Sequence, residues 1–149
     1  MKMNRILIGL ILIATIVTGF NCAEQAAGEE PWSPKQLMEP SVLAEKLAKP
    51  GEHPIIINLG PSGVIAEAID IGPGQEAANI ARLKTELTKF SKDREVVVYC
   101  GCCPFKDCPN IRPAFTALKE AGFEHPYLLN LPENLRVDWI AKGYPMAKP

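Results

Sequence analysis

The sequence predicts an α/β domain with a mainly parallel sheet that helices cover on both faces. Short apolar runs of the kind found in buried strands alternate with segments whose apolar residues recur every three or four positions, as in amphipathic helices. The length of 149 residues suits one domain with a core of its own. In such sheets, ligands bind beyond the carboxyl ends of the strands.

The domain is predicted to open near Trp32 with two short helices. Ser33 and Gln36 have the spacing of a capping box, and an apolar face over residues 42–47 precedes the Lys-Pro-Gly stop at 49–51.

The central segments are predicted to be strand, strand, helix and strand. Residues 54–58 and 95–100 are short apolar runs rich in β-branched side chains, and 68–71 is a third short strand. Between them, Ile80, Leu83, Leu87 and Phe90 recur at helical intervals.

The last third is predicted to be helix, strand and helix. A helix over 113–121 has Pro113 in its first turn and Gly122 at its end, residues 127–130 form a strand, and a final helix over 135–142 stops at Gly143.

The N-terminus has the pattern of a secretory signal over residues 1–22. Lys2 and Arg5 precede an apolar run from Ile6 to Phe20, and about fifteen residues are fewer than the roughly twenty that a transmembrane helix needs. Cys22 stands where a bacterial lipoprotein carries its lipidated cysteine, although Asn21 replaces the small residue preferred before it. We expect a flexible tether over 23–31, a domain over 32–149, and a periplasmic or secreted protein, with anchoring to a bacterial membrane through Cys22 as one form.

The charge balance argues against binding to nucleic acid. Sixteen Lys and Arg residues face seventeen Asp and Glu residues, and no basic cluster is present in the sequence.

A cysteine-rich loop carries the chemical content of the chain. The stretch VVVYCGCCPFKDCPNIRPAF places Cys100, Cys102, Cys103 and Cys108 directly after a predicted buried strand and before a helix. Backbone N–H groups and the positive end of a helix dipole converge at such a point and favour a thiolate, the form that attacks sulfur. Lys106 and Arg112 add two cations nearby in the sequence.

The chain resembles a known family in the order of its elements, in the closing pattern of Trp139, Gly143, Tyr144 and Pro145, and in the string CGCCP…CPN…RPAF-x-AL-x-x-AGF. On these features it is similar to a single-domain rhodanese-like protein of a secreted subgroup with a long, cysteine-rich active loop. The resemblance covers about residues 33–148 and implies a five-stranded α/β fold. It also implies a sulfurtransferase in which Cys100 accepts sulfane sulfur as a persulfide.

The resemblance, together with the residue types of the loop, suggests a role for each residue. The backbone from Gly101 through Cys102 to Cys103 would cradle the persulfide, and Lys106 or Arg112 would attract an anionic donor such as thiosulfate. The expected partners are a small sulfur-containing anion and a thiol acceptor, with no cofactor. Cys102, Cys103 or Cys108 would receive the sulfur or discharge it as a disulfide.

The chain departs from the family pattern at several positions. Asn58 replaces the usual Asp at the end of the first strand, Gly60 stands where an Arg is common, and residues 64–68 replace HIPGA. The usual Arg of the active loop falls on Ile111, and the loop is roughly five residues longer than the usual one. With Asn58 and Gly60 at these two positions, the structural ion pair that the family's Asp and Arg form is missing.

Other interpretations of the loop stay open. Cys100 and Cys103 form a C-x-x-C pair suited to thiol–disulfide exchange, although Pro104 and Pro109 keep a helix from following it directly. Cys102 or Cys103 would form a structural disulfide with Cys108, either in a non-catalytic module or as a brace of a loop in which Cys100 still acts. In a non-catalytic module the thiols could instead bind a soft metal ion; no common metal-ligand spacing matches, and no metal site is assigned. A phosphatase loop is excluded, because Arg112 would need its cysteine at Lys106.

Overall fold

A computed structural model of the chain describes residues 30–148. Five parallel strands form one sheet in the order β1-β5-β4-β2-β3. Their bounds are β1 Leu37–Met38, β2 Ile55–Asn58, β3 Ile69–Asp70, β4 Glu95–Tyr99 and β5 His125–Leu129. The predicted α/β fold with a parallel sheet of about five strands is confirmed.

Strand β4 lies at the centre of the sheet. It pairs with β2 from Ile55 opposite Val96 to Asn58 opposite Tyr99, and with β5 on its other edge. Residues 96–99 of β4 are buried on both faces, as β-branched apolar runs in parallel sheets usually are.

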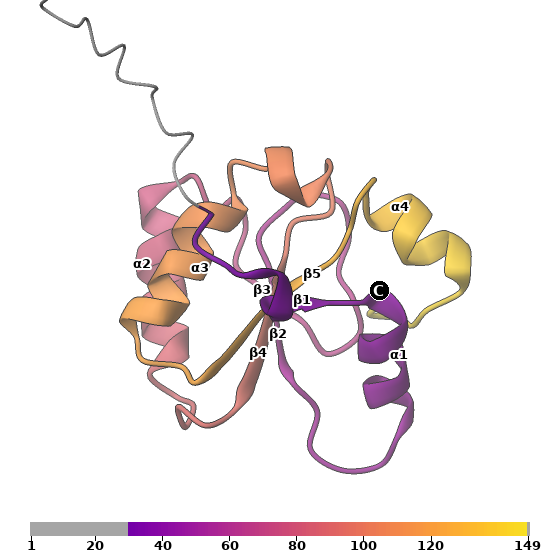
Figure 1. Cartoon of the computed structure of the whole chain (residues 1–149), viewed down its shortest axis with the longest axis horizontal. Helices are drawn as coiled ribbons and strands as arrows, with labels where there is room; N and C mark the ends of the chain where they lie inside the picture. Colours follow the sequence, from indigo (N-terminus) through magenta and orange to yellow (C-terminus); the bar gives the residue numbers. More distant parts are fainter. Residues whose placement is uncertain (1–29, 149) are drawn as a thin grey trace, which may run out of the picture.

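Helices cover both faces of the sheet, as Figure 1 shows, with α2 (Ala77–Leu87) and α3 (Ile111–Glu120) on one side and α1 (Pro40–Ala48) and α4 (Leu135–Asp138) on the other. Two apolar clusters result. One packs α2 and α3 against one face of the sheet, with Leu83 and Phe115 fully buried, and the other packs Leu43 and Trp139 against the opposite face.

The elements differ from the sequence prediction in three places. Strand β1 was not predicted, because two residues are too short a run to show a period, and it pairs only with β5. Helix α3 begins at Ile111 rather than at Pro113, so the proline lies inside the first turn. The final helix is divided into α4 and a 3-10 turn, η3 (Ile140–Lys142), with Trp139 between them.

Two further 3-10 turns complete the described chain. The first, η1 (Pro34–Gln36), carries the predicted capping box, with the N–H of Ser33 donating to Gln36 Oε1 at 2.9 Å. The second, η2 (Phe105–Asp107), lies inside the cysteine loop. No helix between residues 30 and 148 is long and apolar enough to cross a membrane. The predicted signal, Cys22 and most of the tether lie outside the described residues.

The sheet order places a crevice between the carboxyl ends of β2 and β4. The chain continues from β2 to β3 on one side of this pair, and from β4 to β5 on the other side, so the loops that leave β2 and β4 run in opposite directions. In open α/β sheets this switch of direction is where ligands bind. Cys100 is the first residue after β4 and lies at this position.

Candidate functional site

The Cys100 sulfur lies between the loops that follow β2 and β4. A Cβ atom on Gly60 would lie 2.4 Å from both the sulfur and the carbonyl oxygen of Cys100, which is shorter than the contacts that Cβ atoms make in real structures. The absence of a side chain at position 60 is therefore what allows the two loops to meet. The glycine that departs from the family pattern forms one wall of the site.

An amide network at the end of β2 holds Gly60 in place. Asn58 Nδ2 donates to Gly60 O at 2.9 Å and to Asp70 Oδ1 at 3.0 Å, and Asn58 Oδ1 accepts from the N–H of Gly60 at 3.2 Å. Asn58 is only 1% exposed, so these bonds satisfy a buried amide. The predicted loss of the ion pair is thus compensated by a neutral amide that joins β2 to β3.

The N-terminus of α3 contributes a donor to the sulfur. Asn110, the residue before the helix, is 5% exposed, and its Nδ2 donates to Cys100 Sγ at 3.3 Å. Its Oδ1 accepts from the N–H of Gln75 at 3.1 Å, which fixes the orientation of the amide. A Cβ on Gly74 would overlap the Asn110 carbonyl, so this loop too approaches through a glycine. The sequence prediction that a helix start faces the cysteine is consistent with this arrangement.

Gly101 turns the chain beneath α4. Its φ of +77° lies in the left-handed region, and a Cβ there would come within 2.6 Å of Leu135 Cβ. Its carbonyl accepts from the N–H of Leu135 at 3.0 Å. Both the conformation and the close packing require glycine.

Three sulfur atoms converge at the site. Cys100 Sγ and Cys102 Sγ are 3.1 Å apart, and the sulfurs of Cys100, Cys102 and Cys108 all lie within 4.8 Å of one another. Cys103 Sγ is 3.5 Å from Cys102 Sγ. All four described cysteines are free thiols in this structure, and the predicted disulfide from Cys108 to Cys102 or Cys103 is not formed in it.

The same three sulfurs could together bind a soft metal ion, since thiolates favour such ions. The sequence argued against a metal site because no common metal-ligand spacing matches. The convergent group leaves Cys103 out and recruits Cys108 instead.

The surroundings favour a negative charge on Cys100. Its pKa is lowered from 9.0 to about 5, chiefly by the neighbouring thiol of Cys108, and further by the N–H of Cys102 and the amide of Asn110. Burial acts in the opposite direction. Burial and the neighbouring sulfurs raise the pKa of Cys102 to about 12, and the Cys100 sulfur together with burial raises the pKa of Cys108 as well. One thiolate held by two neutral thiols is the resulting charge state near neutral pH.

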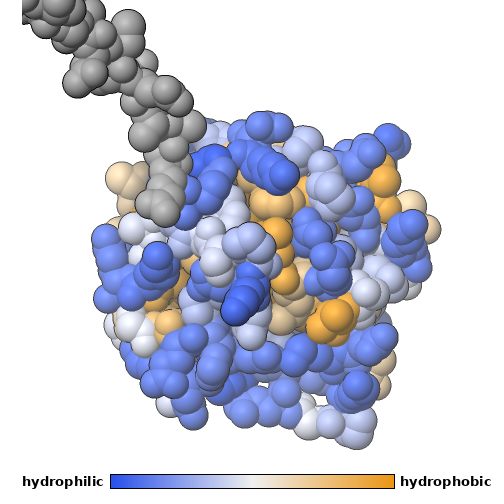
Figure 2. All heavy atoms as spheres, viewed as in Figure 1, coloured by the Kyte–Doolittle hydropathy of each residue, from blue (hydrophilic) through white to orange (hydrophobic). Residues whose placement is uncertain are grey.

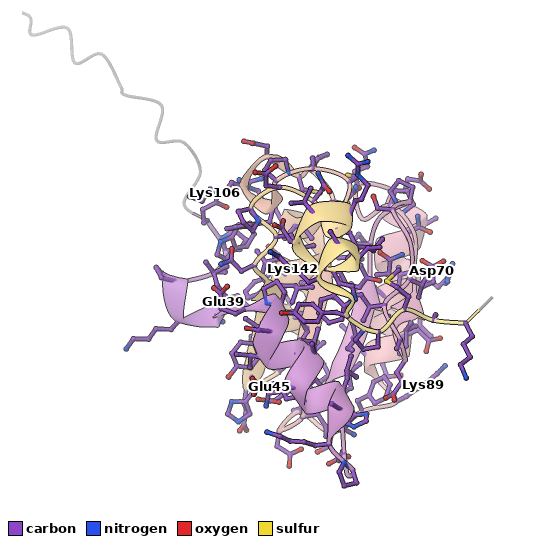
Figure 3. All side chains as sticks on the ribbon, turned by 90° about the vertical axis from the view of Figure 1, so that its right-hand side faces the viewer. Glu39, Glu45, Asp70, Lys89, Lys106 and Lys142 are labelled. Atoms are coloured by element: carbon purple, nitrogen blue, oxygen red, sulfur yellow. The ribbon has the colours of Figure 1, made fainter. Side chains whose placement is uncertain are left out.

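The two predicted cations, Arg112 and Lys106, have different surroundings. Arg112 pairs with Glu30 at 2.6 Å, donates to Lys106 O at 2.8 Å and stacks over Trp32 at 5.5 Å. Lys106 is exposed, and Figure 3 places it on the opposite side of that view from Asp70, the residue beside the Asn58 network. Arg112 therefore braces the loop and the start of the domain, and attraction of an anionic donor by Arg112 or Lys106 stays a prediction.

A groove of about 390 Å³ runs beside the loop but contains no cysteine. Its lining includes Leu37, Phe105, Lys106 and Asn130. Figure 2 shows a largely hydrophilic face crossed by a narrow apolar strip. Because the sulfurs do not line this groove, the reactive position is defined by the crevice at Cys100 and not by this cavity.

Sequence reasoning missed three residues that build the site. Asn110 belongs to the CPN string but had no assigned role, Gly60 was noted only as a departure, and Gly74 was not noted. An Asn directly before a helix that follows a cysteine loop was the available signal for Asn110. The contacts of the two glycines depend on which strands are neighbours, which the sequence did not reveal.

Comparison with known proteins supports the fold. The structure is similar to a rhodanese-like domain of an Anabaena protein solved in solution by NMR, with a TM-score of 0.55 and 23% identity, over 74% of this chain and 76% of that one. No protein-family model matches the chain, and no curated protein does. The strand order, the crevice at Cys100 and this likeness together show that the chain has the rhodanese-like fold.

Proposed function

We propose that this chain is a sulfurtransferase that carries sulfane sulfur as a persulfide on Cys100. The observation that carries the proposal is the setting of Cys100 at the switch point of the sheet, where Asn110 Nδ2 and the N–H of Cys102 both donate to its sulfur. A thiolate held by fixed donors is the nucleophile that sulfur transfer requires.

In the first step, the Cys100 thiolate attacks the outer sulfur of thiosulfate. The sulfur–sulfur bond of thiosulfate breaks, sulfite leaves with the electron pair, and a persulfide remains on Cys100. Asn110 and the N–H of Cys102 donate to Cys100 Sγ, so they stabilise the thiolate that attacks in this step and that leaves again in the next. In the second step, an acceptor nucleophile attacks the outer sulfur of the persulfide, and Cys100 returns to the thiolate.

The same proposal places the mature protein in the periplasm or outside the cell. The support is the charged start, apolar run and polar break of residues 1–22, with Cys22 as the site of a lipid anchor. The expected substrates are a small anionic sulfur donor and a cyanide-like or thiol acceptor.

Intact mass spectrometry of the purified domain tests the reaction. After incubation with thiosulfate, the mass is expected to rise by one sulfur atom, and cyanide is expected to remove that sulfur as thiocyanate. Cys100→Ser protein, prepared alongside, is expected to gain no sulfur. Equal gain by Cys100→Ser would show that another group carries the sulfur.

A further inference from the structure

The enclosure of Cys100 limits what can reach its sulfur. The residue is 2% exposed, with Gly60 against the sulfur on the β2 side and with the buried residues Asn110 and Cys108 around it. A small anion needs only a slight opening of the loop. The thiol of a peptide or of a folded protein brings a backbone with it and cannot enter such a space.

Cys102 connects the enclosed sulfur with the surface. It is exposed, and its Sγ lies 3.1 Å from Cys100 Sγ, so the two sulfurs are in contact. Cys108 cannot take this role, because it is 0% exposed. Cys103 is part-buried and contacts Cys102 at 3.5 Å, one position further along the loop.

We propose that Cys102 is an exit thiol, which takes the sulfane sulfur from the buried Cys100 persulfide and passes it to a peptide or protein thiol at the surface. This inference rests on the proposed function of Cys100. It assigns the acceptor class: a thiol too large to reach Cys100 but able to reach an exposed side chain of the loop.

The relay needs no oxidant or reductant. The anionic outer sulfur of the Cys100 persulfide first accepts the proton of the Cys102 thiol. The Cys102 thiolate then attacks that outer sulfur, the bond from it to Cys100 breaks, and Cys100 leaves as a thiolate, so the protonated persulfide is now on Cys102. The acceptor thiolate then attacks that outer sulfur, so the acceptor becomes the persulfide and Cys102 is left as a thiolate that regains a proton from water.

The chemistry of the loop favours this direction of transfer. A thiol of low pKa is a good leaving group in exchange at sulfur, and Cys100 is the loop cysteine whose donors stabilise its thiolate. Because Cys100 Sγ and Cys102 Sγ are already in contact, the attack is intramolecular and needs no encounter between two molecules.

The test compares two acceptors on the same loaded protein. The unmodified domain, Cys102→Ser and Cys102→Ala are loaded with thiosulfate, freed of excess donor, and discharged with either cyanide or glutathione, with the bound sulfur followed by intact mass. Asp107→Ser serves as the matched control, since Asp107 is an exposed residue of the same loop outside the sulfur cluster.

In both Cys102 variants, we expect the rate of discharge to glutathione, relative to that for cyanide, to fall by about tenfold or more. In Asp107→Ser, the ratio is expected to match that of the unmodified domain. An unchanged ratio in Cys102→Ser and Cys102→Ala would overturn the relay while leaving the Cys100 persulfide intact. Release of sulfide with loss of two hydrogens before any acceptor is added would also overturn it, because Cys102 would then be closing a disulfide. Failure of the unmodified domain to gain sulfur would contradict the proposed function itself, and the relay with it.

Discussion

Replacing Asn110 by alanine removes a side-chain amide that donates to the Cys100 sulfur at 3.3 Å. A hydrogen bond to a charged group contributes about 1.5 to 3 kcal/mol, and we take the lower end for a long bond to sulfur. About 1.5 kcal/mol corresponds to a change of about one in pKa. The pKa of Cys100 should therefore rise from about 5 to about 6 in Asn110→Ala.

The thiolate absorbance of Cys100 measures this change directly. At pH 5 we expect about half of the Cys100 side chains to be thiolate in the unmodified domain, against about one in ten in Asn110→Ala. The signal is the ultraviolet difference between each protein and its Cys100→Ser counterpart, recorded as a function of pH.

Asn79→Ala is the matched control, because Asn79 Nδ2 donates to Pro73 O and Glu76 Oε2 and not to a sulfur. We expect its titration curve to coincide with that of the unmodified domain. If Asn110→Ala also coincides with it, the amide does not stabilise the thiolate and the reasoning is refuted.

Three further outcomes follow from the site. The pKa of Cys100 is lowered from 9.0 to about 5 in the folded protein, so between pH 5 and pH 9 the unfolded chain binds a proton that the folded protein does not. The free energy of unfolding of the unmodified domain, relative to that of Cys100→Ser, should therefore increase as pH rises from 5 to 9. A difference independent of pH in denaturant titrations would contradict the lowered pKa. Gly60→Ala forces a Cβ onto Cys100 and should lower stability by about 1 to 3 kcal/mol and abolish sulfur loading, whereas normal loading would exclude the close packing. Gly101→Ala should lower the free energy of unfolding more than Gly122→Ala does. Both glycines have a positive φ, but only a Cβ atom at position 101 would overlap another side chain, that of Leu135. Equal losses in urea unfolding would show that this overlap does not lower stability.

The buried strands and the helices over 80–90 and 113–121 could be predicted because their periodicity is encoded within single segments. Strand β1 could not be predicted, since Leu37 and Met38 become a strand only through pairing with Leu128 and Leu129. The helix prediction also failed to place the break at Trp139, which is fully buried and donates through Nε1 to Pro145 O at 3.1 Å.

The reactive cysteine could be placed from the sequence, but its surroundings could not. Cys100 follows a buried strand directly, so its position at a strand end is a local property. Its contact with Gly60 links the loops after two neighbouring strands and depends on the order of the strands. Its contact with Asn110, ten positions along the same loop, depends on how that loop folds back on itself. The ion pair of Arg112 could not be predicted either, since its partner Glu30 is 82 positions away along the chain.

The neutral network at the end of β2 explains how the chain keeps this geometry without the expected ion pair. Asn58 is buried and bonds to both Gly60 and Asp70, so it positions the loop that covers the sulfur and adds no charge near the thiolate. A carboxylate at position 58 would place a second negative charge beside Asp70.

The most direct test of the account is the position of the sulfane sulfur in a protein with a simplified loop. Cys102→Ser/Cys103→Ser leaves Cys100 with only Cys108, which is 0% exposed. After reaction with thiosulfate and alkylation, fragment sequencing of the loop peptide is predicted to find one added sulfur, located on Cys100. An unmodified Cys100 in this protein, or sulfur on Cys108, would contradict the assignment of Cys100 as the sulfur carrier.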